Sequence, residues 1–223
     1  MNKNRMYSRQ LDLITPDELD FPILVIGAGG IGSWTTLALA KMGCTNITVI
    51  DNDIVSEENI PSQLYAIDFK GVSKVEALKQ EVYRKTATTI TKVNNTFQIW
   101  ALTHTGIDYK IIIFAVDSLV QRKEIFTYMV SQKIYTDLLI DARMAGELIR
   151  ILTVDGMDTI GVINYFQTLD DSKKPYEEPC TSKAVIYNTL LCGGLIASIV
   201  KKFAKKESIK SNIVFDITNL QIF

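Results

Sequence analysis

Short apolar runs alternate with longer amphipathic stretches along the first half of the chain. Apolar runs rich in β-branched residues are typical of buried strands, and the amphipathic stretches between them predict helices. Helices that join neighbouring strands in this way make those strands parallel, with right-handed crossovers. The predicted strands are Phe21–Ile26, Asn46–Asp51, Thr89–Val93 and Ile111–Val116, and the predicted helices are Ile31–Met42, Lys74–Arg84 and Ser118–Ser131.

Capping residues mark the ends of these helices. Gly43 follows the first helix and suits the left-handed conformation in which many helices end. Ser73 and Glu76 predict a capping box at the start of the second helix, and Ser118 with Gln121 opens the third.

The pattern changes in the C-terminal half of the chain. Short apolar runs follow one another at brief intervals, which is typical of antiparallel strands. The polar loop 167–180 is predicted to be a mobile crossover or lid, and a long helix is expected from about Thr181 to Phe203. The charge-free part of that helix, Ala184–Val200, is expected to be buried rather than to span a membrane. The predicted strands are Leu138–Ala142, Leu148–Val154, Thr159–Tyr165 and Asn212–Thr218.

Composition narrows the expected partners and compartment. A net charge of −1, with 22% charged and 47% hydrophobic residues, gives no reason to expect a nucleic-acid partner. Three cysteines without C-x-x-C spacing and a single histidine argue against a structural zinc site. Sparse, odd-numbered cysteines suit a reducing compartment, and the polar N-terminus shows no signal peptide, so we expect a cytoplasmic protein. Cys44 and Cys192 lie on apolar faces and are expected in the core.

Near the start of the chain, an apolar strand runs directly into a glycine-rich turn that opens a helix. The backbone amides of such a turn and the positive end of the helix dipole receive a phosphate group. The motif therefore predicts a nucleotide-binding site. The glycines of this G-x-G-G-x-G turn are Gly27, Gly29, Gly30 and Gly32.

Taken together, these features predict an α/β fold. We expect a Rossmann-like, mostly parallel sheet with helices on both faces, extended by short antiparallel strands in the C-terminal half. The 223 residues suit a single domain. Its nucleotide-binding half is expected at about 1–135, followed by a C-terminal half with the crossover loop and the long helix.

Five polar residues follow the predicted strands in an order that a simple dehydrogenase does not need. Asp51 ends the second strand and can accept both ribose hydroxyls of an adenosine. Lys74 suits a polyphosphate, and Asp117 follows a buried strand, where one carboxylate beside phosphates can hold Mg²⁺. The amides of Asn59 and Gln63 can contact phosphate or an attacking carboxylate. Alternatively, Lys74 is a solvated helix residue, Asp117 a helix cap and Asn59 a turn former.

Several segments match one protein family in order and spacing. They are Tyr7–Gln10, the G-x-G-G-x-G turn, Ile50–Gln63, Gly71–Leu78 and Asp117–Arg122. On these segments the chain resembles the ThiF/MoeB/HesA family, the bacterial relatives of ubiquitin-activating enzymes. The resemblance is looser in Asp141–Glu147 and again around Cys180.

The resemblance implies an enzyme that binds ATP·Mg²⁺ and adenylates a C-terminal carboxylate, releasing pyrophosphate. The carboxylate would belong to a small ubiquitin-like protein, a sulfur-carrier protein or a peptide. By the same match, Asp51 would hold the ribose, and Asp117 would hold Mg²⁺. The groups that would engage the phosphates are Asn59, Gln63 and Lys74.

The resemblance also implies a homodimer, in which Arg9 would reach across into the site of the partner subunit. We expect the apolar helix Ala184–Val200 to contribute to that interface.

The chain departs from the family pattern in two places. Ser62 stands where the family usually has an arginine, and the family's paired zinc cysteines are absent. Arg143 or Arg122 could replace the missing cation, or the protein has weak or no catalysis. Two alternatives therefore stay open. One is an NAD-dependent oxidoreductase, which explains the glycine turn and Asp51 but leaves Lys74, Asp117 and Arg9 without a role. The other is a non-catalytic nucleotide-binding partner of an active homologue.

Cys180 is a candidate for a later step. Its neighbourhood, Pro179-Cys180-Thr181, resembles that of the thioester cysteine in ubiquitin-activating enzymes. It also directly precedes the predicted long helix, and a helix N-terminus lowers the pKa of a thiol and favours the nucleophilic thiolate. Cys180 is therefore expected either to receive the activated acyl group or to be an incidental residue at a helix start.

Overall fold

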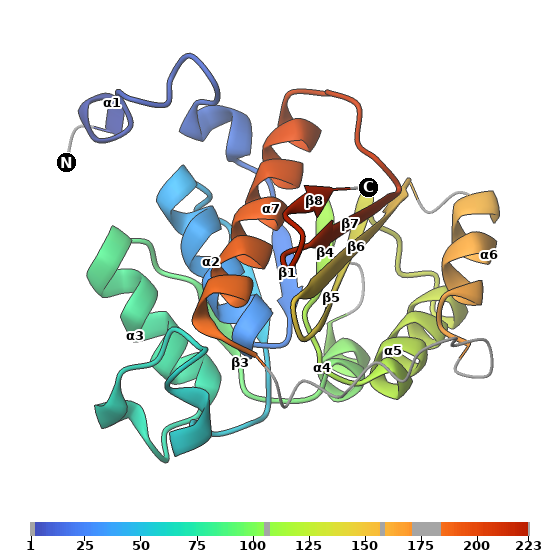
Figure 1. The fold of residues 1–223 in the computed structure, drawn as a ribbon, viewed down its shortest axis with the longest axis horizontal. Coiled ribbons are helices and arrows are strands. Elements are labelled where there is room, and N and C mark those ends of the chain that lie inside the picture. Colours follow the sequence, from blue (N-terminus) through green and yellow to red (C-terminus); the bar gives the residue numbers. More distant parts are fainter. Residues whose placement is uncertain (1–2, 105–107, 157–158, 171–183, 223) are drawn as a thin grey trace.

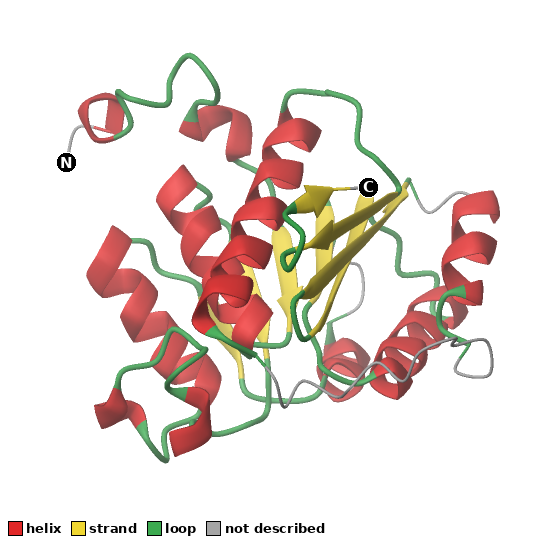
Figure 2. Cartoon of the chain, in the orientation of Figure 1, coloured by secondary structure: helices red, strands yellow, loops and turns green. Residues whose placement is uncertain are grey.

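A mixed β-sheet with helices on both faces forms the centre of the computed structural model, which describes residues 3–104, 108–156, 159–170 and 184–222 (Figures 1 and 2). Within these ranges the sheet has eight strands in the order β3-β2-β1-β4-β5-β6-β7-β8. The strands are β1 Ile23–Ile26, β2 Ile47–Ile50, β3 Thr91–Val93, β4 Ile111–Phe114, β5 Leu138–Ala145, β6 Leu148–Asp155, β7 Asn212–Asp216 and β8 Gln221–Ile222.

The five strands from β3 to β5 are parallel, and β6, β7 and β8 continue the sheet in antiparallel pairs. The central strands β1, β2 and β4 are buried along their whole length because helices cover both of their faces. The strand order reverses at β1, which has β2 on one side and β4 on the other. A crevice at the carboxyl ends of such strands is the usual ligand site in open α/β sheets.

Two apolar clusters pack the helices onto the sheet. Side chains of α2, α3 and α7 join the first cluster, and side chains of α4, α5 and α6 join the second. The two sets lie on opposite sides of the sheet in Figure 1. The helices are α1 Lys3–Met6, α2 Gly30–Met42, α3 Lys74–Thr86, α4 Phe97–Thr103, α5 Leu119–Ser131, α6 Thr159–Gln167 and α7 Ile186–Ala204, with short 3-10 turns at Pro16–Leu19, Glu57–Asn59 and Ile67–Phe69.

This architecture confirms the predicted α/β class, with a mostly parallel sheet extended by antiparallel C-terminal strands. The predicted caps are confirmed at two helices: Gly43 ends α2 in the left-handed conformation, and the Ser118 hydroxyl accepts from the Gln121 amide. The capping box predicted at Ser73 is wrong, because Ser73 makes no side-chain cap. The Lys74 amide instead donates to the carbonyl oxygen of Asp53, at 2.9 Å.

The strand predicted at Thr159–Tyr165 is also wrong, since these residues form α6. An apolar, β-branched run does not by itself separate a strand from a helix. Packing decides here: Tyr165 turns inward against Phe126, with ring centroids 4.6 Å apart, while Ile160 stays exposed. A helix on the outside of the sheet thus replaces an expected strand.

Three further predictions need correction or completion. The segment Leu138–Ala142 was expected in an antiparallel pair, but β5 is parallel to β4 and antiparallel to β6, so it is where the sheet changes direction. The helix expected from Thr181 begins at Ile186. Most of the predicted crossover loop, 171–180, lies outside the described residues, and α4 had no counterpart among the predicted elements.

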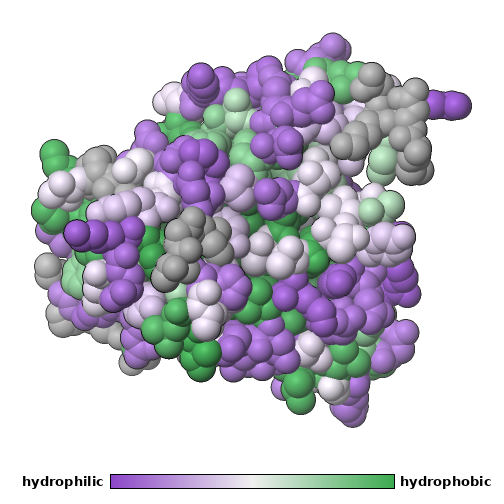
Figure 3. Space-filling view, turned by 180° about the vertical axis from the view of Figure 1, so that it is seen from behind, coloured by the Kyte–Doolittle hydropathy of each residue, from purple (hydrophilic) through white to green (hydrophobic). Residues whose placement is uncertain are grey.

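Hydrophilic residues cover most of the face seen in Figure 3, and apolar residues form small separate groups there. Among the helices of the described residues, none combines the length and apolar character needed to cross a membrane.

Candidate active site

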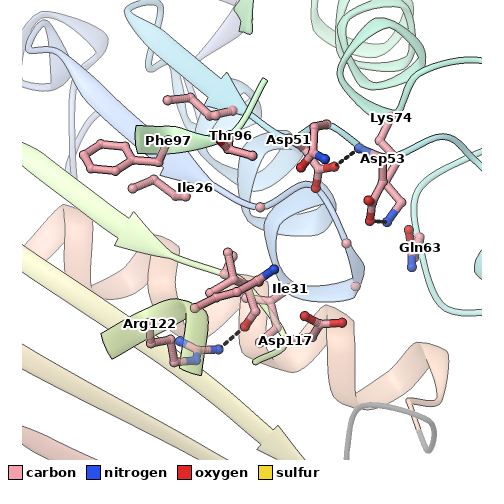
Figure 4. A pocket seen from close by; sticks show the side chains of 18 of the residues that line it. Ile26, Ile31, Asp51, Asp53, Gln63, Lys74, Thr96, Phe97, Asp117 and Arg122 are labelled. Atoms are coloured by element: carbon pink, nitrogen blue, oxygen red, sulfur yellow. Dashed lines mark hydrogen bonds and ion pairs between the residues drawn. The ribbon is translucent and has the colours of Figure 1, made fainter. Parts of the chain in front are cut away.

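A cavity of about 820 Å³ lies at the carboxyl ends of β1, β2 and β4 (Figure 4). Three chain segments that leave these strands form a large part of its wall: the glycine turn, the loop after β2 and the start of α5. The predicted site residues that line this cavity are Gly27, Gly29, Gly30, Asp51, Asn59, Gln63, Lys74 and Asp117.

The glycine turn has its shape because two of its residues have no side chain. Gly27 has φ of +101°, and a Cβ there would lie 2.6 Å from the carbonyl oxygen of Ala115. A Cβ on Gly32 would lie 1.9 Å from the carbonyl oxygen of Gly27, so Gly32 lets α2 approach the turn although it does not line the cavity. The turn therefore presents the N-terminus of α2 to the cavity, where backbone amides and the helix dipole favour an anion.

Asp51 is held by the backbone around it. One carboxylate oxygen accepts from the Ala28 amide at 2.7 Å, and the other accepts from the Asp53 amide at 2.8 Å. Burial raises the pKa of Asp51, although both hydrogen bonds oppose that rise. Each carboxylate oxygen keeps a further lone pair, which suits a pair of ribose hydroxyls.

Lys74 lies in the first turn of α3 with a side chain only 10% exposed. Its ammonium donates to Asp53 at 2.8 Å, and the Asp53 side chain is 62% exposed. Asp53 therefore orients the Lys74 charge at the cavity. The sequence prediction omitted Asp53, although its position two residues after Asp51 pointed to the same loop.

The two predicted amide side chains differ in how they are held. The Asn59 side-chain oxygen accepts from the Ser56 amide at 3.0 Å, as a turn former would. The Gln63 side-chain oxygen is buried, and within the described part of the chain no group hydrogen-bonds to it. A buried acceptor without a partner at a cavity wall is the kind of group that a ligand hydroxyl or a bound water satisfies.

Asp117 follows β4 and its side chain is exposed in the cavity (Figure 4). Among the described residues there is no group of three or more histidine, cysteine, aspartate or glutamate side chains that could hold a metal ion on its own. Mg²⁺ is commonly bound by one or two carboxylates together with substrate phosphates and water. The single carboxylate of Asp117 thus fits a cation that arrives with a nucleotide.

Two arginines form a buried part of the wall beside Asp117. Arg122 and Arg143 both line the cavity, and both make ion pairs with Asp141, whose side chain is fully buried. Asp141 also accepts from the Tyr165 hydroxyl at 3.0 Å. Two guanidinium groups thus share one buried carboxylate in this part of the wall. No local pattern could pair Arg122 with Asp141, because Arg122 lies on α5 and Asp141 on β5. They meet only because β4, which α5 follows, lies next to β5 in the sheet.

Ser62 also lines the cavity and is buried. Its carbonyl oxygen accepts from the Trp34 indole at 3.0 Å and from the Thr189 hydroxyl at 2.9 Å. These bonds join α2 and α7 to the loop that carries Gln63. A buried tyrosine that the sequence prediction also missed, Tyr65, donates to the Ala28 carbonyl oxygen of the glycine turn.

Of the other predicted residues, Arg9, Cys44 and Cys192 do not line this cavity. Arg9 is exposed on the N-terminal segment and does not line the cavity of its own chain. Cys180 lies outside the described residues. Cys44 and Cys192 are buried, as predicted, and burial raises the pKa of each thiol to about 12.

The family model described as the ThiF family matches residues 7–222. The chain is similar to the molybdopterin-synthase adenylyltransferase of Salmonella typhimurium, with 26% identity in an alignment 204 residues long that covers 78% of this chain and 81% of that protein. It is also similar to the tRNA threonylcarbamoyladenosine dehydratase of Escherichia coli, at 41% identity over 64 residues, which are 28% of this chain and 24% of that one.

Solved structures share the fold over the whole chain. The structure of E. coli MccB with ATP aligns with a TM-score of 0.75 at 19% identity, covering 100% of this chain and 71% of that one. The E. coli tRNA N6-threonylcarbamoyladenosine dehydratase aligns with a TM-score of 0.68 at 21% identity, covering 91% of this chain and 95% of that one. At these identities the likeness establishes the fold.

Proposed function

The chain belongs to the ThiF family, and from that membership we propose that it adenylates a C-terminal carboxylate with ATP and releases pyrophosphate. The protein is an adenylyltransferase. The observation that carries this proposal is that one cavity is lined by the glycine turn, Asp51, Lys74 and Asp117, each at the end of a different segment. A nicotinamide cofactor would use the first two and would leave the buried lysine and the exposed carboxylate without a role.

In the proposed reaction, a carboxylate oxygen of the substrate attacks the α-phosphorus of ATP. A bond from that oxygen to phosphorus forms, the bond to the bridging oxygen of the β-phosphate breaks, and pyrophosphate leaves with the electron pair. The attacking carboxylate is already ionised at neutral pH, so the step needs no general base. Catalysis then consists of alignment and charge stabilisation, as in other phosphoryl-type transfers.

The predicted site residues that line the cavity have proposed roles in that alignment. Asp51 accepts the ribose hydroxyls, and the amides at the start of α2 receive a phosphate. Lys74, with Asn59 and Gln63, binds the phosphates. Asp117 holds Mg²⁺, which neutralises charge on the triphosphate when bound.

The proposed substrate is the C-terminus of a small ubiquitin-like or sulfur-carrier protein, or of a peptide. Support comes from the similarity to a molybdopterin-synthase adenylyltransferase, and from the fold that the chain shares with the microcin C7 biosynthetic enzyme MccB in complex with N-formylated MccA. A transfer of the acyl group to Cys180 as a thioester is part of the proposal and rests on the sequence pattern alone.

We also propose that the protein acts as a homodimer built from single adenylation domains. Helix α7 and the residue before it carry a group of apolar side chains between 37% and 46% exposed. A second subunit would bury these side chains. Arg9 does not line the cavity of its own chain and would then be able to reach the cavity of the partner subunit. These apolar residues are Val185, Ile186, Tyr187, Leu190 and Leu191.

Thermal stability with different nucleotides tests the proposed function. The purified protein is heated with ATP·Mg²⁺, ATP plus EDTA, AMP or NAD, and the series is repeated on Asp117→Ala. A ligand at a hundred times its Kd stabilises by about 2.7 kcal/mol, or roughly 5–11 °C for a chain of this size. A shift with ATP·Mg²⁺ that Asp117→Ala abolishes supports the proposal.

The other outcomes contradict it. A shift with NAD alone would make the protein an oxidoreductase. No shift with any nucleotide would support a non-catalytic partner subunit, the alternative that Ser62 favours.

A further inference from the structure

Arg122 connects the ends of two neighbouring strands beneath the cavity. Its guanidinium donates to the carbonyl oxygen of Val116, directly before Asp117, and to that of Ala142 in β5, at 2.9 Å. It also pairs with the buried carboxylate of Asp141. One side chain thus holds the segment that leaves β4 against β5.

The position of Arg122 is itself fixed. Asp141 is fully buried, and a buried carboxylate is very costly to leave unpaired, so Arg122 cannot swing away freely. Asp141 is held from its other side by the Arg143 Nε at 2.8 Å. The Arg143 guanidinium in turn donates to the carbonyl and the hydroxyl oxygens of Thr168, at 3.0 and 2.9 Å. Among the described residues, none of its hydrogen bonds reaches the segment that follows β4.

Asp117 lacks comparable support of its own. Its side chain is exposed and makes no hydrogen bond or ion pair with another residue of the described part of the chain. Its place in the cavity therefore depends on the backbone that carries it. That backbone is held at Val116 by Arg122.

We propose that Arg122 is a positioning residue for Asp117. It acts through the Val116 carbonyl and keeps the Asp117 carboxylate where a divalent cation on the nucleotide can reach it, and Asp141 keeps Arg122 in place. The inference rests on the proposed function, since it concerns the metal-dependent part of ATP binding. Groups that orient a metal ligand typically alter metal affinity about 10–100-fold when they are replaced.

The test compares ATP affinity with Mg²⁺ and with EDTA, measured by isothermal titration calorimetry. Arg122→Lys keeps a positive charge, but its one nitrogen cannot replace both Nη1, which pairs with Asp141, and Nη2, which donates to the Val116 and Ala142 carbonyls. We expect the Mg²⁺-dependent gain in ATP affinity to fall by about tenfold, with the affinity in EDTA nearly unchanged. Asp141→Asn keeps the arginine but removes the carboxylate that holds its guanidinium in position, so we expect the same fall.

Arg143→Lys is the matched control, because it makes the same substitution in the other arginine bound to Asp141. We expect it to retain the Mg²⁺-dependent gain. Equal weakening with Mg²⁺ and with EDTA in Arg122→Lys would overturn the proposal, since a direct phosphate contact or a loosened fold would do that. A fall in Arg143→Lys as large as that in Arg122→Lys would also overturn it.

Failure of the proposed function gives a different result. The wild-type protein would then bind ATP in neither condition, and the positioning role would fall with it.

Discussion

The Lys74 ammonium lies 2.8 Å from the Asp53 carboxylate at the wall of the candidate site, with Lys74 buried and Asp53 exposed. An ion pair with one exposed partner contributes little to stability, typically about 0–1 kcal/mol. The pair therefore matters more for where it places the lysine charge than for how tightly it holds the fold.

The first prediction follows from that placement. Lys74→Met should weaken ATP·Mg²⁺ binding by about 10–100-fold, because a charge-assisted hydrogen bond is worth about 1.5–3 kcal/mol. The midpoint of thermal unfolding without ligand should change little. Titration calorimetry and a thermal melt measure the two effects.

Lys70→Met is the control for Lys74→Met. Lys70 pairs with Glu57, and both side chains are more than half exposed. Its loss should leave ATP affinity unchanged. If both variants bound ATP as the wild type does, Lys74 would have no role in nucleotide binding.

A second prediction concerns Ser62. Ser62→Arg keeps the carbonyl that Trp34 and Thr189 bind and directs a new cation into the cavity. Because Arg122 and Arg143 already place two guanidinium groups in the wall, we expect ATP affinity to rise by less than about threefold, under 1 kcal/mol. A gain of a hundredfold would mean that the natural site has lost a needed cation, and would favour the non-catalytic alternative.

The glycine turn gives a third prediction, on stability. Gly27→Ala combines a strained φ of +101° with a Cβ 2.6 Å from the Ala115 carbonyl oxygen. We expect a loss of about 2–5 kcal/mol from strain and overpacking together. Gly71→Ala separates the two effects, because Gly71 has φ of +84° but open space around its Cβ position. Chemical denaturation should place Gly71→Ala between the wild type and Gly27→Ala, and equal losses would contradict the close contact at Ala115.

Thiol labelling provides a fourth prediction. With pKa values raised to about 12 by burial, Cys44 and Cys192 stay protonated at pH 8 and present no thiolate to an alkylating reagent. Brief treatment of the folded protein with iodoacetamide, followed by peptide mass spectrometry, should leave both unmodified. Unfolding in guanidinium should expose them at once. Any rapid modification of the native protein should fall on Cys180.

The parts of the site that the sequence predicted are those fixed by local chain geometry. The glycine turn, Asp51 and Asp117 each follow an apolar strand directly, so their place at one edge of the sheet follows from the parallel topology. Asp141 could not be found in this way. Its interior apolar surroundings resemble those of any strand residue, and its role depends on Arg122, nineteen positions earlier on another element.

The misassigned helix α6 has a similar explanation. Its sequence is apolar and β-branched, and the local pattern fits a strand as well as a helix. What decides between them is the packing of Tyr165 under α5 and the hydroxyl it donates to Asp141. Both are tertiary contacts, which no window of neighbouring residues contains.

The last prediction tests whether Arg9 serves the partner subunit. Arg9 is exposed and does not line the cavity of its own chain, whereas Asp117 does. If each site takes Arg9 from one subunit and Asp117 from the other, Arg9→Ala and Asp117→Ala homodimers should both bind ATP·Mg²⁺ poorly. Subunits mixed in equal amounts and allowed to exchange should form mixed dimers with one intact site each. Random pairing would then restore about a quarter of all sites, a stoichiometry that calorimetry can measure. A mixture that binds no better than its components, or a protein that is monomeric by light scattering, would exclude a role for Arg9 across the dimer.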